Sequence, residues 1–393
     1  MLEWLKKQYT KQKLVRCFHA AELYQTYKRG DKTLYIYPKI HSVQFKDNQT
    51  IYTFTLQNGM NPSEITKKEY VFQQVFGKQI EIDGDVKKFT LIVYHNSFKS
   101  EVLYNYQAFY DTIKQMKLPI IAGKDKNGQW RAFDLIKHPH ILIAGETGSG
   151  KSTQLRSILT TLIQFKKPNE LELYLADCKK SEFHIFKQIE HVKCVLSNSR
   201  DIRKMLQHIK QELDERSNLT DKFGVVHIDD LPQEHKKPYI IVCIDEFVML
   251  RNDSKIMDIL IEIVAIGRTL GVFAILSMQR PTSDVLDTTI RANLTVRMGF
   301  KVADATNARV INTIGADKLD TAGRFILRIS KQEELQAPYL DIDKAKKILE
   351  PYMIAKEAKE VKTKTKQTSN TPTFLEPIQE KIEWFGVDED ERA

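Results

Sequence analysis

The chain has 393 residues and a formal net charge of +9 at pH 7, with a sequence pI near 9.0 that favours a polyanionic partner. Its length predicts roughly two to three domains, with cores large enough to exclude a disulfide-stapled scaffold. Its four cysteines lack zinc-site or redox spacing, so we expect a reduced, cytoplasmic compartment. No apolar run reaches the ~18 to 20 residues that span a bilayer, so we expect no transmembrane segment, although a partner could recruit the protein to a membrane.

The first 117 residues predict an N-terminal segment and a small domain, and neither carries a recognisable set of catalytic residues. Residues 1–30 are basic and carry apolar residues at helical spacing, so we expect a basic, helical N-terminal segment that packs on the next domain; an independent DNA-binding arm is the less favoured alternative. Residues 31–117 predict a small α+β domain, because period-two strands surround a helix and a connecting helix follows.

A strand, a glycine-rich loop and a helix follow one another from residue 141. The loop has the G-x-x-x-x-G-K-[ST] spacing of a phosphate loop. Its predicted nucleotide-binding residues are Gly145, Glu146, Thr147, Gly148, Ser149, Gly150, Lys151, Ser152 and Thr153. Glycines let the backbone N–H groups face a phosphate, and the helix start adds its positive end. Lys151 would reach the β- and γ-phosphates and Ser152 would ligate Mg²⁺, so ATP and Mg²⁺ are the expected cofactors.

Two later strands end in polar residues that fit the same chemistry. The apolar run 239–244 ends in Asp245 and Glu246, a Walker B pattern. Asp245 would hold the Mg²⁺ shell and Glu246 would polarise the attacking water. The alternative to a Walker B motif is an acidic pair at an ordinary strand end. The phosphate loop earlier in the chain makes this alternative less favoured. Gln279 follows the strand 272–277, where a polar residue can sense the γ-phosphate.

The remaining signals are weaker. His138 and His140 have metal-ligand spacing, but without a third ligand nearby we expect no metal there. Residues 351–393 are rich in Lys, Thr and Glu and predict a mostly disordered tail. The tail pair Trp384-Phe385 is either a docking motif or part of a segment folded back on the body.

Ordered motifs from about residue 118 to 340 resemble the FtsK/SpoIIIE family of ring-shaped DNA translocases. They are residues 138–152, 244–247, 279–281, 290–293 with Arg297, 316–319 and 322–324. The ending 335–340 is similar to the branch carried by conjugative elements of Gram-positive bacteria. The resemblance implies an α/β, RecA-like P-loop motor domain at 118–350, with a mostly parallel sheet and helices on both faces.

The family also implies a hexamer around double-stranded DNA, with ATP sites between subunits. A neighbour's arginine would complete each site; Arg268 is the first candidate, and Arg216 and Arg280 are alternatives. Lys179, Lys180 and Arg291 match channel-facing, DNA-binding positions, although a solvated basic loop is the other interpretation of each. A relaxase or a membrane channel component is a candidate partner.

The predicted function is therefore an ATPase that couples ATP hydrolysis to translocation of double-stranded DNA, serving transfer or maintenance of a conjugative or other mobile element. Relatives of this kind carry membrane helices before the motor or a winged-helix domain after it, and from this sequence we expect neither. A related motor that moves protein in secretion is one alternative. A nucleotide-gated DNA-binding adaptor that does not translocate is the other.

Overall fold

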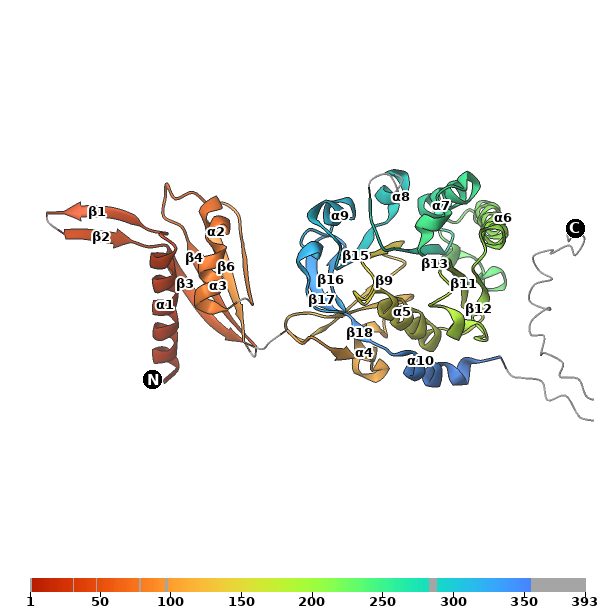
Figure 1. The fold of residues 1–393 in the computed structure, drawn as a ribbon, viewed down its shortest axis with the longest axis horizontal. Helices are drawn as coiled ribbons and strands as arrows, with labels where there is room; N and C mark the ends of the chain where they lie inside the picture. Colours follow the sequence, from red (N-terminus) through yellow and green to blue (C-terminus); the bar gives the residue numbers. More distant parts are fainter. Residues whose placement is uncertain are drawn as a thin grey trace, which may run out of the picture. The chain divides into compact units, whose positions relative to one another are not determined.

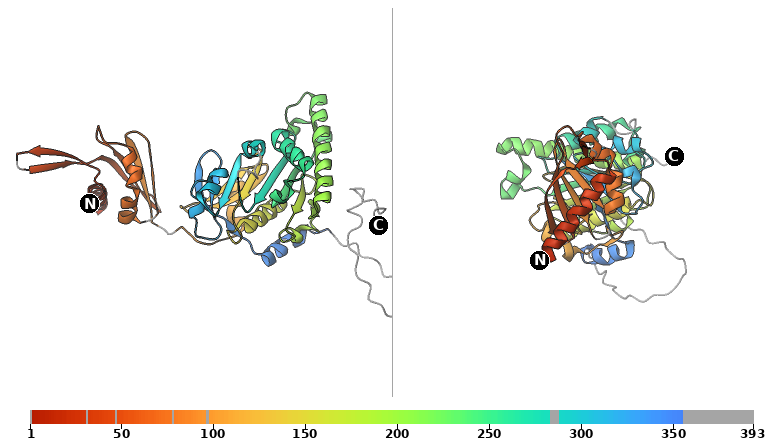
Figure 2. Two further views of the ribbon diagram at one scale, coloured as in Figure 1. Left: turned by 45° about the horizontal axis from the view of Figure 1, so that its top comes forward. Right: turned by 90° about the vertical axis from the view of Figure 1, so that its left-hand side faces the viewer.

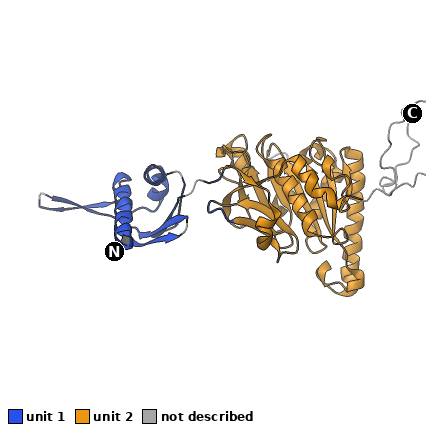
Figure 3. Cartoon of the chain, turned by 90° about the horizontal axis from the view of Figure 1, so that it is seen from below, with its two compact units in different colours: residues 1–99, 126–129 blue, residues 100–125, 130–393 orange. Residues whose placement is uncertain are grey.

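The structure, a computed structural model, describes residues 2–30, 32–46, 48–77, 79–95, 98–282 and 288–354. The chain divides into two compact units (Figure 3), one of residues 1–99 and 126–129, the other of residues 100–125 and 130–393. Most of the predicted tail, residues 355–393, lies outside the described residues.

The small unit is an antiparallel sheet covered by helices. Its sheet has the order β3-β4-β6-β5, and a separate hairpin pairs β1 with β2. Its elements are α1 (Leu2–Ala20), β1 (Gln25–Arg29), β2 (Lys32–Ile36), β3 (Lys39–Lys46), β4 (Gln49–Thr55), α2 (Ser63–Lys67), α3 (Glu69–Phe76), β5 (Ile80–Gly84) and β6 (Lys88–Tyr94). Every second residue of β4 is buried, as expected for a sheet with one face on a core.

The unit boundaries differ from those predicted, because burial ties both flanking helices to neighbouring elements. Helix α1 buries Phe18 against Phe54 and Phe72, so it packs on the α+β domain as the sequence favoured, and residues 1–30 form one compact unit with that domain. Helix α4 (Tyr106–Ile113) belongs to the large unit, where Phe109 lies in one cluster with Ile121. The large unit therefore begins near residue 100 rather than 118.

The large unit is built on a ten-stranded sheet with the order β12-β11-β13-β14-β10-β15-β16-β17-β8-β9. The strands are β8 (Pro119–Lys124), β9 (Trp130–Asp134), β10 (Ile141–Ala144), β11 (Leu171–Asp177), β12 (Val192–Leu196), β13 (Tyr239–Asp245), β14 (Val272–Met278), β15 (Val296–Phe300), β16 (Arg324–Arg328) and β17 (Gln332–Gln336). The six from β12 to β15 pair in parallel, and the other four are added antiparallel. The tight β8–β9 and β16–β17 connections enforce that antiparallel half, since parallel neighbours require long crossovers.

Helices cover both faces of this sheet, as predicted (Figures 1 and 2). The large-unit helices are α4, α5 (Lys151–Phe165), α6 (Ser199–Phe223), α7 (Ser254–Ile266), α8 (Thr288–Asn293), α9 (Ala305–Val310) and α10 (Ile342–Leu349), and β7 (Val102–Leu103) pairs with β18 (Pro338–Tyr339). Alternate strand residues face opposite cores: Val242 packs in the cluster of α6 and α7, whereas Cys243 packs in that of α5. Across the described part of the chain, no helix combines the length and apolar character that a bilayer crossing requires.

Candidate nucleotide-binding site

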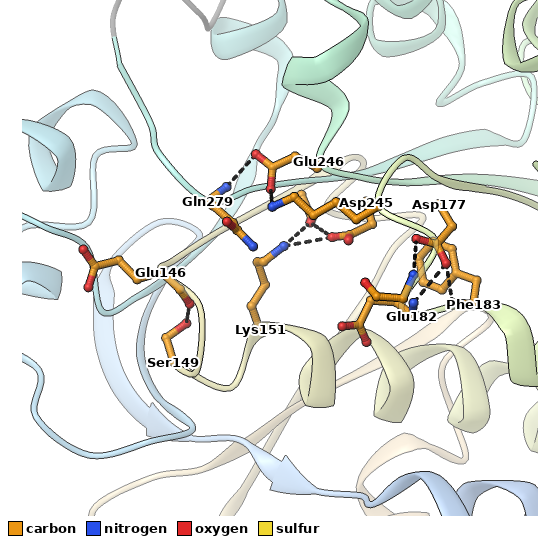
Figure 4. A network of polar contacts seen from close by, with 12 residues as sticks. Glu146, Ser149, Lys151, Asp177, Glu182, Phe183, Asp245, Glu246 and Gln279 are labelled. Atoms are coloured by element: carbon orange, nitrogen blue, oxygen red, sulfur yellow. Dashed lines mark hydrogen bonds and ion pairs between the residues drawn. The ribbon is translucent and has the colours of Figure 1, made fainter. Parts of the chain in front are cut away.

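The phosphate loop joins the end of β10 to the start of α5, and the neighbouring strands hold its backbone. Gly145 N–H donates to the Met278 carbonyl (3.1 Å), and Glu146 N–H donates to the Lys301 carbonyl (2.8 Å). The Ser149 hydroxyl closes the turn by donating to the Glu146 carbonyl at 2.7 Å (Figure 4). The loop is therefore tied to the carboxyl ends of β14 and β15, where ligands bind in open α/β sheets.

Gly150, the residue before α5, must be glycine for two reasons. Its φ of +103° lies in the region that side chains disfavour. A Cβ at this position would also lie 2.7 Å from the backbone of Gly323. That close approach joins the loop to the antiparallel half of the sheet, where Gly323 N–H donates to the Ser149 carbonyl at 2.8 Å.

A cavity of about 840 Å³ opens in front of this loop. Its lining residues are Ser100, Glu101, Glu146, Thr147, Gly148, Gly150, Lys151, Ser152, Thr153, Lys179, Ser181, Glu182, Gln279, Ala322, Gly323, Gln336, Ala337, Pro338 and Tyr339. Most of the predicted phosphate-loop residues are among them, together with Gln279. The wall from β16 to β18 was not predicted as part of the site, although residues 322–324 were noted as a motif. Gln336 holds that wall by donating to the Ala322 carbonyl and accepting from Arg324.

Lys151 and Asp245 form a buried ion pair at the floor of the cavity (Figure 4). Lys151 Nζ lies 2.8 Å from Asp245 Oδ1 and 2.8 Å from Ser277 Oγ. The Ser277 hydroxyl in turn donates to Asp245 Oδ1. Strand β14 lies between β10 and β13, so Ser277 occupies the gap between the two motifs. The Lys151 ammonium is thereby held, dehydrated, where a phosphate could replace the carboxylate as its partner.

The oxygen donors at this floor fit Mg²⁺. Ser152 lines the cavity one residue into α5. The side-chain hydrogen bonds that reach Asp245 from described residues converge on Oδ1, which leaves the second carboxylate oxygen for a cation. Mg²⁺ typically takes one or two carboxylates and completes its shell with substrate phosphates and water. Ser152 and Asp245 are thus suited to hold it together with a nucleotide.

Glu246 sits beside this pair in a strained backbone conformation. Its φ of 56° and ψ of 51° are left-handed, and it precedes the 3₁₀ helix η4 (Phe247–Leu250). Oε1 accepts the Gln279 backbone N–H at 3.1 Å, and Oε2 accepts Lys179 Nζ at 2.9 Å. Strain of this kind in a non-glycine residue is often stored at functional sites. The structure thus brings together Glu246, Gln279 and Lys179, of which Lys179 was predicted to contact DNA.

The other predicted DNA-binding residues lie outside the cavity. Lys180 is exposed, with a φ of 59°, and follows Lys179 in the connection after β11. Arg291 is half-buried in α8, and its carbonyl accepts a hydrogen bond from the Arg297 guanidinium at 2.6 Å. Burial, reinforced by the nearby Arg291 and Arg328, lowers the pKa of Arg297.

The candidate trans-acting arginines differ in accessibility. Arg268 is exposed between α7 and β14, at the amino ends of the parallel strands, whereas the phosphate loop lies at their carboxyl ends. Arg280 is exposed next to Gln279. Arg216 is 1% exposed, and its guanidinium donates to Glu212 (2.9 Å) and to the Leu270 carbonyl (3.0 Å). Arg216 is therefore occupied within its own chain.

His140, the second of the two histidines before β10, is a buried hydrogen-bond acceptor. Within the described ranges, no group of three or more His, Cys, Asp or Glu residues is placed to hold a metal ion. His140 is 1% exposed, and its Nδ1 accepts the Ala274 N–H at 3.1 Å. Burial lowers the pKa of His140 to about 4, so the neutral ring is a structural acceptor between β10 and β14.

The large unit is similar to known proteins in sequence and in fold. Residues 107–237 match the model of the FtsK/SpoIIIE family. The large unit contains an FtsK/SpoIIIE-family domain. The resemblance predicted from the motifs is thereby confirmed for this part of the chain, which contains the phosphate loop.

Two bacterial FtsK proteins illustrate the similarity in sequence. The DNA translocase FtsK of Streptococcus pneumoniae is 32% identical over 251 residues, which are 59% of this chain and 33% of that protein. The DNA translocase FtsK of Lactococcus lactis subsp. lactis is 29% identical over 255 residues, or 60% of this chain and 33% of that protein. The chain thus spans about a third of the length of the curated relatives that it matches.

Solved structures extend the similarity beyond the FtsK/SpoIIIE domain. The pCW3 conjugation coupling protein TcpA, in a monomer form with ATPγS, has a TM-score of 0.59 and 25% identity, covering 80% of this chain and 93% of that one. EssC (ATPases 2 and 3) from Geobacillus thermodenitrificans has a TM-score of 0.56 at 18% identity, covering 65% of this chain and 52% of that one. The EssC match shows the fold alone, and both matches confirm the predicted α/β motor fold.

Proposed function

We propose that this chain is an ATP-driven motor that translocates double-stranded DNA. The observation that carries the proposal is the geometry around Lys151: one cavity holds the phosphate-loop lysine, 2.8 Å from Asp245, with Glu246 following Asp245 directly. A loop that binds a triphosphate therefore stands beside the two carboxylates needed to place a metal and to accept a proton from water.

In this proposal each residue has a defined task. Lys151 exchanges Asp245 for the β- and γ-phosphates, and Ser152 with Asp245 holds Mg²⁺, which would neutralise charge on the phosphates. Glu246 orients the attacking water and takes its proton. Gln279 lines the cavity next to Glu246, and is placed to report on the γ-phosphate. With these roles, catalysis comes mainly from positioning the attacking water and from stabilising the negative charge on the transferred phosphoryl group.

Charge and similarity support DNA as the substrate. The net charge of +9 suits a phosphate backbone, and the matched relatives in Streptococcus and Lactococcus are named DNA translocases. The extensive match to a conjugation coupling protein supports a role in transfer or maintenance of a mobile element, in the cytoplasm beside a relaxase or a membrane channel. A backbone-tracking motor of this kind needs little sequence preference.

The composition of the cavity wall supports an assembly in which sites are shared. None of the residues that the structure places around the cavity is an arginine. A neighbour's arginine in a ring, here proposed to be a hexamer, would supply the missing charge. Arg268, which is exposed at the amino ends of the parallel strands, is the proposed source of that arginine.

ATP hydrolysis measured with and without long linear duplex DNA tests the proposal, with triplex displacement as the readout of movement. We expect DNA to stimulate hydrolysis and ATP to drive displacement of the third strand. A folded protein that hydrolyses ATP at the same rate with and without duplex DNA would contradict a translocase.

The likeness to EssC keeps a protein-moving motor as the second candidate. Such a motor is expected to show ATP turnover that responds to a protein substrate rather than to duplex DNA. The sequence holds a single phosphate-loop motif, whereas the matched EssC structure contains ATPases 2 and 3. A DNA-binding adaptor is the third candidate; it would bind duplex DNA and hydrolyse ATP without displacing the third strand.

A further inference from the structure

The connection after β11 is a preformed turn fixed by one buried carboxylate. Asp177, the last residue of β11, is 2% exposed. Its Oδ1 accepts the backbone N–H of Ser181 (3.1 Å), and its Oδ2 accepts those of Glu182 (2.9 Å) and Phe183 (3.0 Å), as Figure 4 partly shows. Three charge-assisted hydrogen bonds to one side chain give residues 178–183 a defined shape.

This turn, here called the lysine turn (residues 178–183), lies next to the acidic pair. Asp177 is the register partner of Asp245 across the parallel strands β11 and β13. The lysine turn therefore leaves the sheet beside Glu246. Glu182 and Ser181 at its far end also line the nucleotide cavity. A shift of the turn would act directly on the residues around the γ-phosphate.

Its two lysines have different surroundings. Lys179 extends to Glu246, with Nζ 2.9 Å from Oε2, and its side chain is 33% exposed. Lys180 is exposed in the left-handed region, and has no ion pair among the described residues. The turn thus presents one cation to the catalytic carboxylate and one to solvent.

We propose that Lys179 is a positioning residue that restrains Glu246, and that a phosphate of duplex DNA releases it by drawing the lysine turn away. The release by duplex DNA rests on the proposed function. In the restrained state both oxygens of Glu246 are occupied, Oε2 by Lys179 and Oε1 by the Gln279 N–H. A carboxylate held by two donors is a poor base, because each bond stabilises its ionised form.

Duplex DNA is suited to the release. Lys179 is partly exposed, so a phosphate can reach the same ammonium that Glu246 holds. The closely spaced phosphates of duplex DNA offer several anions in place of the single Glu246 carboxylate, and their binding to lysines is favoured by the release of counterions from the DNA. Lys180, exposed beside it, would add a second contact to the same backbone. ATP hydrolysis would then be slow until DNA contacts the lysine turn, so the protein would consume little ATP when no DNA is bound.

The Lys179→Gln variant tests the restraint by steady-state ATP hydrolysis with and without long duplex DNA. We expect its DNA-free rate to rise by about tenfold, the ratio that corresponds to about 1.4 kcal/mol for a lost charge-assisted bond. Its stimulation by DNA should fall towards unity. Lys179→Arg keeps a cation near Glu246, and should restore both the low rate and the stimulation. Lys187→Gln, at an exposed lysine of the same β11–β12 connection, is the matched charge control.

Binding of a fluorescent ATP analogue and the melting temperature establish that each variant is folded. A folded, ATP-binding Lys179→Gln protein whose DNA-free rate stays at or below wild type would overturn the restraint, while DNA stimulation of the wild type would leave the proposed function standing. A raised DNA-free rate in a protein that duplex DNA never stimulates would support the restraint on Glu246 and overturn both its release by DNA and the translocase function.

Discussion

Lys151 Nζ lies 2.8 Å from Asp245 Oδ1, so the cation of the phosphate loop and the carboxylate of the Walker B strand neutralise each other where both are buried. Each residue is 3 to 4% exposed in its side chain. A buried charge that loses its partner is costly, whereas removing both charges is tolerated better. The pair therefore links nucleotide binding to the stability of the fold.

Lys151→Ala should lose most of the affinity for ATP and also destabilise the protein. Loss of charge-assisted bonds to phosphate should weaken binding by roughly tenfold to a hundredfold, and Asp245 becomes a lone buried charge. Titration with a fluorescent ATP analogue and thermal melting measure the two effects. Adding Asp245→Asn to Lys151→Ala should recover part of the melting temperature without recovering ATP binding. A double variant that melts below Lys151→Ala would contradict the pairing.

Glu246→Gln should bind ATP and turn it over slowly. The amide oxygen can still accept the Gln279 N–H, so the loop geometry is preserved, but the side chain no longer accepts a proton from water. We expect kcat to fall by about a hundredfold to a thousandfold with little change in ATP affinity. Single-turnover hydrolysis with radiolabelled ATP measures the chemical step. Hydrolysis at the wild-type rate would remove Glu246 from the role of base.

The phosphate loop and the acidic pair could be predicted because both are local patterns. The loop binds through backbone N–H groups, so a short run such as 145–152 carries its own geometry, and Asp245 needs only a buried strand before it. Gln336 could not be predicted, because its place in the wall depends on the pairing of β17 with the distant strand β8, where its partner is Lys124, and on a hydrogen bond to Ala322. Pairing between distant strands has no comparable local signature.

Charged residues were harder to assign because sequence patterns do not reveal their partners. Lys179 was predicted to face DNA, and its contact with Glu246 at 2.9 Å was not predicted. Arg216 was an alternative trans-acting arginine, yet it is buried against Glu212 and the Leu270 carbonyl. Long cationic side chains reach several ångströms from their backbone, so a helix position alone leaves their contacts open.

Arg268 should act on the site of a neighbouring subunit. Arg268→Ala alone should retain ATP binding and the wild-type melting temperature, because the side chain is exposed, but should hydrolyse ATP slowly. Mixing it with equal amounts of Lys151→Ala should restore hydrolysis, since about a quarter of the head-to-tail interfaces would pair an intact loop with an intact arginine. Mixtures no more active than the separate variants would exclude Arg268 as the shared residue. Arg280→Ala, treated the same way, tests the remaining alternative.

His140 should make the stability of the fold fall as the pH drops. The pKa of this buried imidazole is lowered to about 4 from 6.5, so the unfolded chain binds more protons than the folded one between these values. The neutral ring therefore stabilises the fold fully above about pH 6.5, and this contribution is lost as the pH falls towards 4. The free energy of unfolding should decrease by about 3 kcal/mol over this window from His140 alone.

His140→Asn tests this assignment by urea denaturation from about pH 4 to about pH 7.5, a range that spans the window between the folded and unfolded pKa values. The Asn Oδ1 can accept the Ala274 N–H in place of Nδ1, and Asn tolerates the φ of 60° at this position. Stability of the variant should depend less steeply on pH, because no group titrates there. His184→Asn, at an exposed histidine, should keep the wild-type slope. If His140→Asn and His184→Asn have equal slopes, the acid sensitivity arises elsewhere in the fold.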